Sequence, residues 1–153
     1  MSNLELKVPP VLLVVIFAIG MWWVAQLTGQ QMLLIDLKWL LSPFFAVTGV
    51  VFPLMGVISF KRAETTVNPV TPNASTALVT SGIYRYSRNP MYVGFLFLLM
   101  AWGLLLANIW AILLTVFFVF YLSRFQIQPE EKALRNSFGA AFYDYEQRVR
   151  RWL

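Results

Sequence analysis

Three long stretches without a charged residue constrain this chain more than any other feature of its sequence. They cover residues 8–35, 39–60 and 91–123 of 153. Because a helix needs roughly 20 apolar residues to cross the hydrocarbon core of a membrane, each stretch is long enough to do so. With 59% hydrophobic and only 12% charged residues, the chain is also far more apolar than a soluble domain. The sequence therefore predicts an all-α integral membrane protein.

The third stretch predicts two helices rather than one. Its 33 residues are too many for a single untilted span, and Asn108 lies within a break that we place over residues 103–110. We expect a tight hairpin of two short helices here, which gives four transmembrane helices in total. A secretory signal is the competing interpretation of the first stretch. We disfavour it because residues 8–27 are longer than a usual signal core and lack a clear small-residue cleavage site.

The basic residues fall almost entirely on one side of this four-helix topology, and only Lys38 falls on the other. Because loops rich in Lys and Arg stay in the cytoplasm, this asymmetry predicts a multi-pass cell membrane protein with both termini and the central loop cytoplasmic. The net charge of +5 then reflects orientation and attraction to anionic lipid heads rather than binding to nucleic acid. The residues on the basic side are Lys7, Lys61, Arg62, Arg85, Arg88, Arg124, Lys132, Arg135, Arg148, Arg150 and Arg151.

The chain contains no cysteine and no histidine. Their absence excludes disulfides, thiol nucleophiles, Cys/His metal sites and a histidine general base, and we expect no metal. Any chemistry must therefore use the remaining polar side chains or the backbone, or a cofactor must carry it.

Prolines and glycines punctuate the predicted helices. The first helix should run over residues 10–27. The second, over residues 39–60, carries Pro43 and Pro53, which bend a helix by removing backbone hydrogen bonds. We interpret this bend and the neighbouring glycines as packing features rather than as a groove. Residues 61–80 are rich in Thr, Asn, Pro and Ser. This composition predicts an ordered or semi-ordered cytoplasmic loop.

Two helix-start signals follow that loop. Asn89 and Pro90 fit the N-cap and first position of the third helix. Residues 129–131, Pro-Glu-Glu, give a second signal in which the carboxylates would lie at the positive end of a helix dipole. Apolar residues then recur at three- and four-residue steps. They predict an amphipathic C-terminal helix on the cytoplasmic membrane face, with Gly139 as the place for a bend.

Polar side chains gather in residues 81–94, which read Ser-Gly-Ile-Tyr-Arg-Tyr-Ser-Arg-Asn-Pro-Met-Tyr-Val-Gly. With Glu130 and Glu131 they would form a polar rim beside the apolar helices. Carboxylates could pair with an ammonium or accept from ribose hydroxyls, arginine could hold a carboxylate, and aromatic rings could stack on a base. Helix capping and anchoring at the membrane interface explain the same residues about equally well.

The same segment resembles the signature of the isoprenylcysteine carboxyl methyltransferase family and its phospholipid methyltransferase relatives. The core of that signature reads Gly-x-Tyr-x-x-x-Arg-His-Pro-x-Tyr-x-Gly. The chain matches it from Gly82 to Gly94, with Asn89 in place of the histidine. A second block matches in order and spacing, so the resemblance covers roughly residue 61 to the end. That block consists of Arg124-Phe125, Glu130-Glu131, Phe138-Gly139, Tyr145 and Arg148-Val149.

The resemblance implies an enzyme that uses S-adenosylmethionine, with its active site on the cytoplasmic side. Residues 61–153 would form the cofactor-binding catalytic region, and residues 1–60 an N-terminal two-span membrane segment. Glu130 and Glu131 would contact the polar groups of the cofactor. The residues that would line the rest of its pocket are Gly82, Tyr84, Arg88, Asn89, Pro90 and Tyr92.

The resemblance also implies a lipophilic acceptor that arrives from the bilayer among the membrane lipids. Arg88 and Arg124 would be catalytic, and Arg124 and Arg148 would bind the acceptor. We expect carboxyl O-methylation of an isoprenylcysteine-like, prenylated substrate, because a carboxylate is already anionic and needs orientation rather than a base. Any role that depends on imidazole cannot be transferred to Asn89. The open alternatives are phospholipid N-methylation, small-thiol S-methylation, a nicotinamide-dependent reductase, and a non-catalytic membrane protein that binds lipid or a partner.

Overall fold

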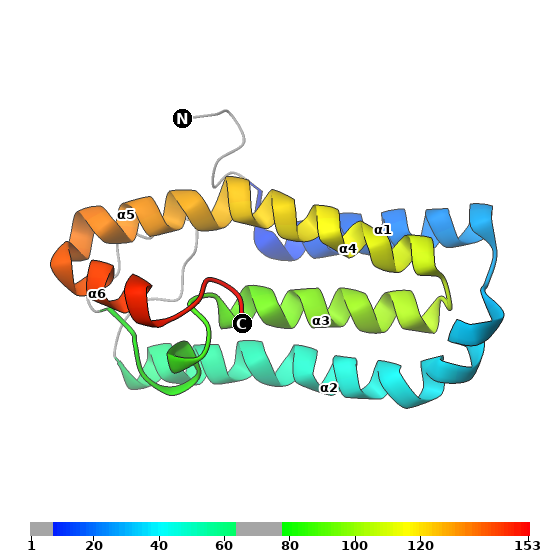
Figure 1. The fold of residues 1–153 in the computed structure, drawn as a ribbon, viewed down its shortest axis with the longest axis horizontal. Helices are drawn as coiled ribbons and strands as arrows, with labels where there is room; N and C mark the ends of the chain where they lie inside the picture. The colour runs from blue at the N-terminus through cyan, green and yellow to red at the C-terminus, as the bar shows by residue number, and fades with distance from the viewer. Residues whose placement is uncertain (1–7, 64–77) are drawn as a thin grey trace.

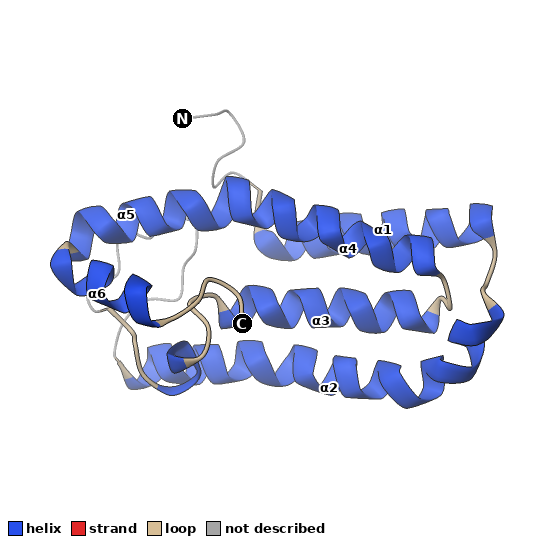
Figure 2. Cartoon of the chain, in the orientation of Figure 1, coloured by secondary structure: helices blue, strands red, loops and turns tan. Residues whose placement is uncertain are grey.

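The computed structural model describes residues 8–63 and 78–153, which are helical over most of their length (Figures 1 and 2). No β-strand occurs within these two ranges, so the all-α class is confirmed there. Three helical stretches in them are long and apolar enough to cross a membrane: Pro10–Thr28, Ile35–Arg62 and Ile109–Phe138. The protein is thus a membrane protein by length and composition, as the sequence predicted.

The first two helices are α1 (Pro10–Thr28) and α2 (Met32–Arg62). The predicted bounds of α1 are confirmed to within one residue, but the predicted start of α2 at residue 39 was wrong. The charged side chains of Asp36 and Lys38 led us to begin the helix after them. Charge sets how deep a residue lies in a membrane, whereas the local sequence Met-Leu-Leu-Ile-Asp-Leu-Lys consists mainly of residues that favour helix.

The predicted hairpin is present as α3 (Pro90–Leu105) and α4 (Ile109–Leu122). The chain turns at Ala107, whose φ is 50°, and α4 begins after Asn108. The Asn108 side chain caps α4 by accepting a 2.8 Å hydrogen bond from the backbone N–H of Ala111. The break over residues 103–110 is therefore confirmed, while the crossing of the membrane by all four helices stays a prediction.

Beyond α4 a further helix begins at Gln128, with Pro129, Glu130 and Glu131 in its first turn, and this confirms the helix start predicted at residues 129–131. A π-helical turn, η3 (Ser123–Ile127), leads directly into α5 (Gln128–Phe138). Proline can follow such a turn because the wider turn relaxes the hydrogen-bond register that its missing N–H would interrupt. Gly139, with φ 51°, separates α5 from α6 (Ala140–Arg148), and this confirms the predicted bend.

Close helix contacts hold the bundle together. α2 packs along α3, and α1 packs against α4 and α3. A Cβ atom added to Gly94 would lie 2.3 Å from Cδ of Pro53, so α2 and α3 approach as closely as they do only because this position lacks a side chain. A hydrophobic core lies between α1, α3 and α4, where Met21, Leu99 and Phe118 are almost completely buried. The packing interpretation of the glycines is thus supported.

The polar segments collect at one end of the bundle (Figure 1). The short 3₁₀ turn η2 (Gly82–Arg85), the start of α3, α5, α6 and residues 149–153 all lie there. Of the loop predicted over residues 61–80, residues 64–77 lie outside the described part of the chain. The fold therefore brings both blocks of the signature to the same end of the helices.

Candidate functional site

An ion-paired cluster joins the two signature blocks. Arg88, just before α3, places Nη2 3.1 Å from Oε1 of Glu131 in α5 and Nη1 3.0 Å from Oε1 of Glu146 in α6. The side chains of Arg88 and Glu131 are only 9% and 4% exposed. Charges that are buried to this degree are stable in a protein when they are paired. Arg88 therefore links three elements at the polar end of the bundle.

The backbone before Arg88 explains why it reaches this position. Gly82 has φ +63°, which favours glycine, and a Cβ atom there would lie 2.6 Å from Oγ of Ser59 in α2. The resulting 3₁₀ turn buries Tyr84, whose ring packs edge-on against Phe60 at 5.3 Å. Gly82 thus fits η2 against α2 and directs the following residues toward α5.

Three arginines surround the Glu131 carboxylate. Arg151 approaches it as a fork, with Nε 3.0 Å from Oε1 and Nη2 2.7 Å from Oε2. Arg135, one helical turn along α5, lies 3.7 Å away and also donates two hydrogen bonds to Glu146, at 2.9 and 2.6 Å. We call these five residues, Arg88, Arg135, Arg151, Glu131 and Glu146, the Arg/Glu network. The hydrogen bonds from Arg135, together with the nearby charge of Arg88, lower the pKa of Glu146 to about 2.

Arg88 has more donors than the network uses. Two of its buried nitrogens, Nε and Nη1, have no hydrogen-bond partner within the described residues. Nη1 is close enough to Glu146 for an ion pair but not aligned for a hydrogen bond. Because an unsatisfied buried donor is costly, this side of Arg88 is suited to receive an acceptor oxygen from a ligand.

Tyrosine hydroxyls complete the cluster. Tyr92 in α3 donates a 2.5 Å hydrogen bond to Oε1 of Glu130 in α5. Tyr145 in α6 donates to the backbone carbonyl of Tyr84 at 2.8 Å. Burial raises the pKa of both Tyr84 and Tyr145 well above the usual value, so both stay neutral and keep their protons. These contacts tie α3, α5, α6 and η2 together around the network.

The sequence expectations for Asn89 and Pro90 have different outcomes. Pro90 occupies the first turn of α3, as predicted. The side chain of Asn89 does not cap that helix, and its Nδ2 instead donates a 2.9 Å hydrogen bond to the carbonyl of Arg151. Asn89 therefore occupies the N-cap position as predicted, but its side chain is held by residues 149–153 and does not cap the helix.

Two predicted arginines lie outside the Arg/Glu network. Arg124 is exposed on η3, and its guanidinium lies 5.6 Å from the centre of the Phe125 ring. Arg148 is exposed on α6 and donates to the backbone carbonyl of Asp144 in its own helix at 3.1 Å. Both lie at the polar end of the bundle without entering its buried cluster, so their proposed roles in binding an acceptor stay predictions.

Sequence reasoning missed three members of the network. The spacing of Glu131 and Arg135 is that of an i,i+4 pair, which a search for helix salt bridges could have found. No such signal exists for Glu146, because the break at Gly139 folds α6 back on α5 and brings it to Arg135. Arg151 was identified only as one of the basic residues on the cytoplasmic side.

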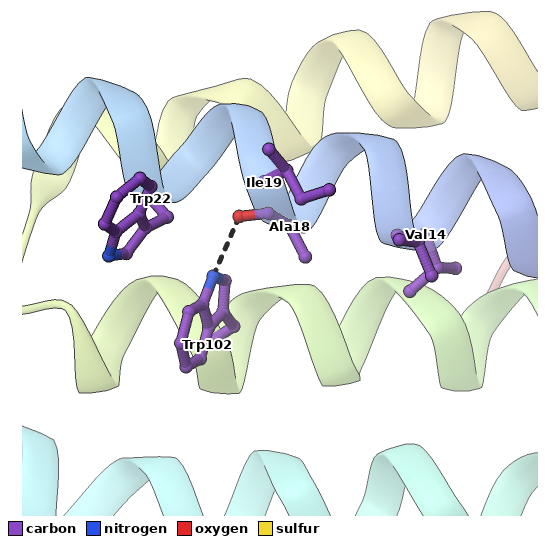
Figure 3. A pocket seen from close by; sticks show the side chains of 6 residues that line it. Val14, Ala18, Ile19, Trp22 and Trp102 are labelled. Carbon is purple, nitrogen blue, oxygen red and sulfur yellow. Dashed lines mark hydrogen bonds between the residues drawn. The ribbon is translucent and has the colours of Figure 1, made fainter.

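A separate apolar cleft lies between α1 and α3 (Figure 3). It measures about 310 Å³, and apolar residues line it: Val14, Val15, Ala18, Ile19, Trp22 and Trp102. The indole N–H of Trp102 donates to the carbonyl of Ala18 across it at 3.0 Å. Because helix rise is about 1.5 Å per residue, Trp102 lies about 18 Å along α3 from Pro90, well away from the Arg/Glu network.

Known proteins resemble parts of this chain. A relative of Haemophilus influenzae named an uncharacterized protein is 43% identical over 63 residues, which is 41% of this chain and all of that protein. The protein-S-isoprenylcysteine O-methyltransferase of Saccharomyces cerevisiae is 33% identical over 72 residues, or 47% of this chain and 30% of the yeast protein. A probable protein-S-isoprenylcysteine O-methyltransferase of Oryza sativa subsp. indica is 34% identical over 106 residues, or 67% of this chain and 54% of the rice protein.

The chain therefore spans about half the length of the rice relative, and less of the yeast one. No solved structure matches it. The sequence model of the phospholipid methyltransferase family matches residues 37–141, which is more than half of the chain. This match confirms the resemblance seen in the signature, and the chain belongs to the phospholipid methyltransferase family.

Proposed function

We propose that this protein transfers a methyl group from S-adenosylmethionine to a lipophilic acceptor, by carboxyl O-methylation of an isoprenylcysteine-like substrate. The observation that carries the proposal is the meeting of the two signature blocks, where Arg88 and Glu131 form a buried ion pair at 3.1 Å. Two relatives named as isoprenylcysteine O-methyltransferases match the chain. A scaffold that only bound lipid would have no reason to bury charges at this end of an apolar bundle.

The residues present fit S-adenosylmethionine. Its ammonium and ribose hydroxyls are partners for carboxylates, and its carboxylate is a partner for arginine. The cluster supplies Glu130 and Glu131 as acceptors, and Arg88 holds a buried Nε that has no partner within the described residues. When bound, this cofactor would supply a methyl group on a positively charged sulfur.

The chain's own residues would orient the acceptor rather than activate it. An acceptor carboxylate is anionic at neutral pH and needs no general base, so the absence of histidine is no obstacle. We assign Arg88 to the acceptor end of the site, with Arg124 and Arg148 at the exposed rim, where their charges attract an anionic group. Arginine suits this task because its planar fork matches a carboxylate.

We further propose that α1 to α4 all cross the membrane with the polar end in the cytoplasm. The charge-free faces of α1, α2 and α4 expose large apolar side chains, including Trp23, Phe44 and Phe117, as lipid-facing helices do. Apart from Lys38, the basic residues within the described ranges lie at the end that carries the Arg/Glu network, as the positive-inside rule expects of the cytoplasmic side. An acceptor would then reach the site sideways from the inner leaflet.

Phospholipid N-methylation is the second candidate, and the Tyr92 contact to Glu130 favours it. An amine acceptor must lose a proton, and Glu130, which lies in contact with Tyr92 at the polar end of the bundle, is a carboxylate that could accept it. The two candidates differ in which acceptor group is methylated, so they can be separated directly.

Calorimetry on the detergent-solubilised chain tests the cofactor. We expect saturable binding of S-adenosylmethionine by the wild type and by the Asp144→Asn control, whose exposed carboxylate lies on α6 outside the network. We expect binding to be lost or strongly weakened in Glu131→Gln. Saturable binding of a reduced nicotinamide cofactor, with none of S-adenosylmethionine, would instead favour a reductase.

A labelled-methyl assay tests the acceptor. Three compounds are compared in mixed micelles: an S-farnesylcysteine analogue with a free carboxylate, its carboxamide, and phosphatidylethanolamine. Carboxyl O-methylation predicts label only in the first compound, as a base-labile ester. Label only in phosphatidylethanolamine would support the N-methylation candidate instead.

A further inference from the structure

Residues 149–153 close the polar end of the bundle, and we call them the closing segment. The backbone leaves α6 in an extended conformation at Val149 and runs back to the start of α3 (Figure 1). There the backbone N–H of Arg88 donates a 3.0 Å hydrogen bond to the carbonyl of Arg150. At the far end, the indole N–H of Trp152 donates to Oγ of Ser123 at 3.2 Å. The closing segment is therefore attached to α3 and to η3.

The side chain of Asn89 also attaches the closing segment to the residues before α3. Its amide donates to the carbonyl of Arg151 at 2.9 Å, and its own N–H donates to Oγ of the fully buried Ser87 at 3.1 Å. An asparagine at the N-cap would ordinarily bond to its own helix. Here its side chain fixes the residue that contacts Glu131.

The contact of Arg151 with Glu131 does more than neutralise a charge. Without Arg151, Glu131 would still have Arg88 at 3.1 Å and Arg135 at 3.7 Å, so its carboxylate would remain compensated. What Arg151 adds is a two-point contact to both oxygens, at 3.0 and 2.7 Å, which fixes the plane of the carboxylate.

We propose that Arg151 is a positioning residue for cofactor binding, which holds Glu131 in its working orientation, and that Asn89 anchors the closing segment that carries it. This inference rests on the proposed function. The signature match does not include Arg151, and it gives Asn89 a place in the pocket but no anchoring role. Arg151 acts through Glu131, so its effect must depend on that carboxylate. Asn89 acts through the backbone of Arg151, so its effect must be smaller.

The test measures the Kd for S-adenosylmethionine by calorimetry and the melting temperature of the full chain. We expect Arg151→Ala to raise the Kd about tenfold, the effect of one charge-assisted hydrogen bond. Arg151→Lys should recover part of this loss, since lysine keeps the charge but not the fork. Asn89→Ala should raise the Kd about threefold, in line with a neutral hydrogen bond.

Arg150→Ala is the matched control. It removes the same charge from the closing segment, but the side chain of Arg150 is exposed and only its backbone carbonyl holds Arg88. We expect its Kd to equal that of the wild type. If Arg151→Ala and Arg150→Ala behave alike, Arg151 contributes only charge and the inference is overturned.

A double variant separates positioning from general structure. If Arg151 works through Glu131, adding Arg151→Ala to Glu131→Gln should change the remaining affinity and the melting temperature no more than Arg150→Ala does. Independent, additive losses would show that Arg151 acts elsewhere.

A wild type that binds no S-adenosylmethionine overturns the proposed function and this inference together. Normal wild-type binding with an unchanged Arg151→Ala overturns this inference alone.

Discussion

Buried polar side chains join the helices at both ends of the bundle, but they are neutral at one end and charged at the other. At the end where α3 turns into α4, Asn108 is fully buried, and its amide donates to Oγ1 of Thr28 at 2.7 Å and to the carbonyl of Gly29 at 2.6 Å. Its side-chain oxygen accepts from Ala111 at 2.8 Å. At the other end, Arg88 is buried among carboxylates and keeps a nitrogen without a partner within the described residues.

This difference separates a structural contact from a candidate site. Neutral groups that satisfy one another hold α1, α3 and α4 together around Asn108 at little electrostatic cost. A network of three arginines and two glutamates joins helices at a larger cost in free energy, because each buried charge must be desolvated. The polar end therefore carries charge for a reason other than closing the bundle, and binding of a charged cofactor and acceptor is such a reason.

The largest effect should come from Arg88→Ala. It removes a buried charge that contacts both Glu131 and Glu146, and with it the proposed acceptor-orienting donor. We expect methyl transfer per folded molecule to fall by about 100-fold or more, because misplacing a reactant by about 1 Å costs that much. Arg88→Lys should retain part of the cofactor affinity but little of the rate. Activity of Arg88→Ala within threefold of the wild type would remove the argument for a site at this end.

Gly94→Val should weaken both ends together. A side chain here would meet Pro53 at 2.3 Å and the carbonyl of Gly49 at 2.8 Å, so α2 and α3 must separate. Overpacking of this kind costs roughly 1–3 kcal/mol, and here backbone atoms must move. The measurements are the melting temperature and the Kd for S-adenosylmethionine. Gly20→Ala is the control, since a Cβ atom on Gly20 meets nothing within 4 Å. An equally stable Gly94→Val would contradict the close packing of α2 and α3.

Much of the bundle could be predicted because membranes leave few choices. Charge-free stretches gave α1, α2 and the α3–α4 hairpin, and the bend at Gly139 followed from a residue that tolerates positive φ. The errors came where local signals compete with distant partners. Asn89 takes the N-cap position as predicted, but its side chain donates to the carbonyl of Arg151 instead of capping the helix. The helix start at residues 129–131 was predicted correctly, but the π-helical turn that joins it to α4 was not.

The polar cluster could be predicted only in part, for a related reason. The signature named Tyr92, Arg88 and Glu131, and the fold brings these blocks together as expected. Glu146 and Arg151 enter through the reversal after Gly139 and through the closing segment, and neither has a periodic pattern. Periodicity identifies the face of a helix, but it does not show which helices fold back on one another.

Asn108→Ala should affect stability alone. It removes the donor to Thr28 and Gly29 and leaves the buried N–H of Ala111 without its cap, and an unsatisfied buried donor costs about 1–3 kcal/mol. The Kd for S-adenosylmethionine, measured well below the lowered melting temperature, should equal that of the wild type. Thr28→Val, which removes one of the two acceptors, should show a smaller loss of stability. A changed Kd in Asn108→Ala would mean that the two ends of the bundle are coupled and that the comparison between them is too simple.

The smallest effect concerns Glu146 and pH. Its pKa falls from an ordinary 4.5 to about 2 in the folded chain, because Arg135 donates hydrogen bonds to its carboxylate and the charge of Arg88 lies in ion-pair contact with it. A lowered folded-state pKa means that these contacts stabilise the protein above about pH 4.5, and that this contribution is lost as the pH falls toward 2. The effect is modest because the side chain of Arg135 is 45% exposed and water screens the pair.

The difference in melting temperature between the wild type and Glu146→Gln should therefore be constant from pH 7 to about 4.5 and shrink below pH 4.5. Asp144→Asn, an exposed carboxylate two residues away, should show no such trend, and an unchanged difference at pH 3 would mean that Glu146 is not held by these arginines.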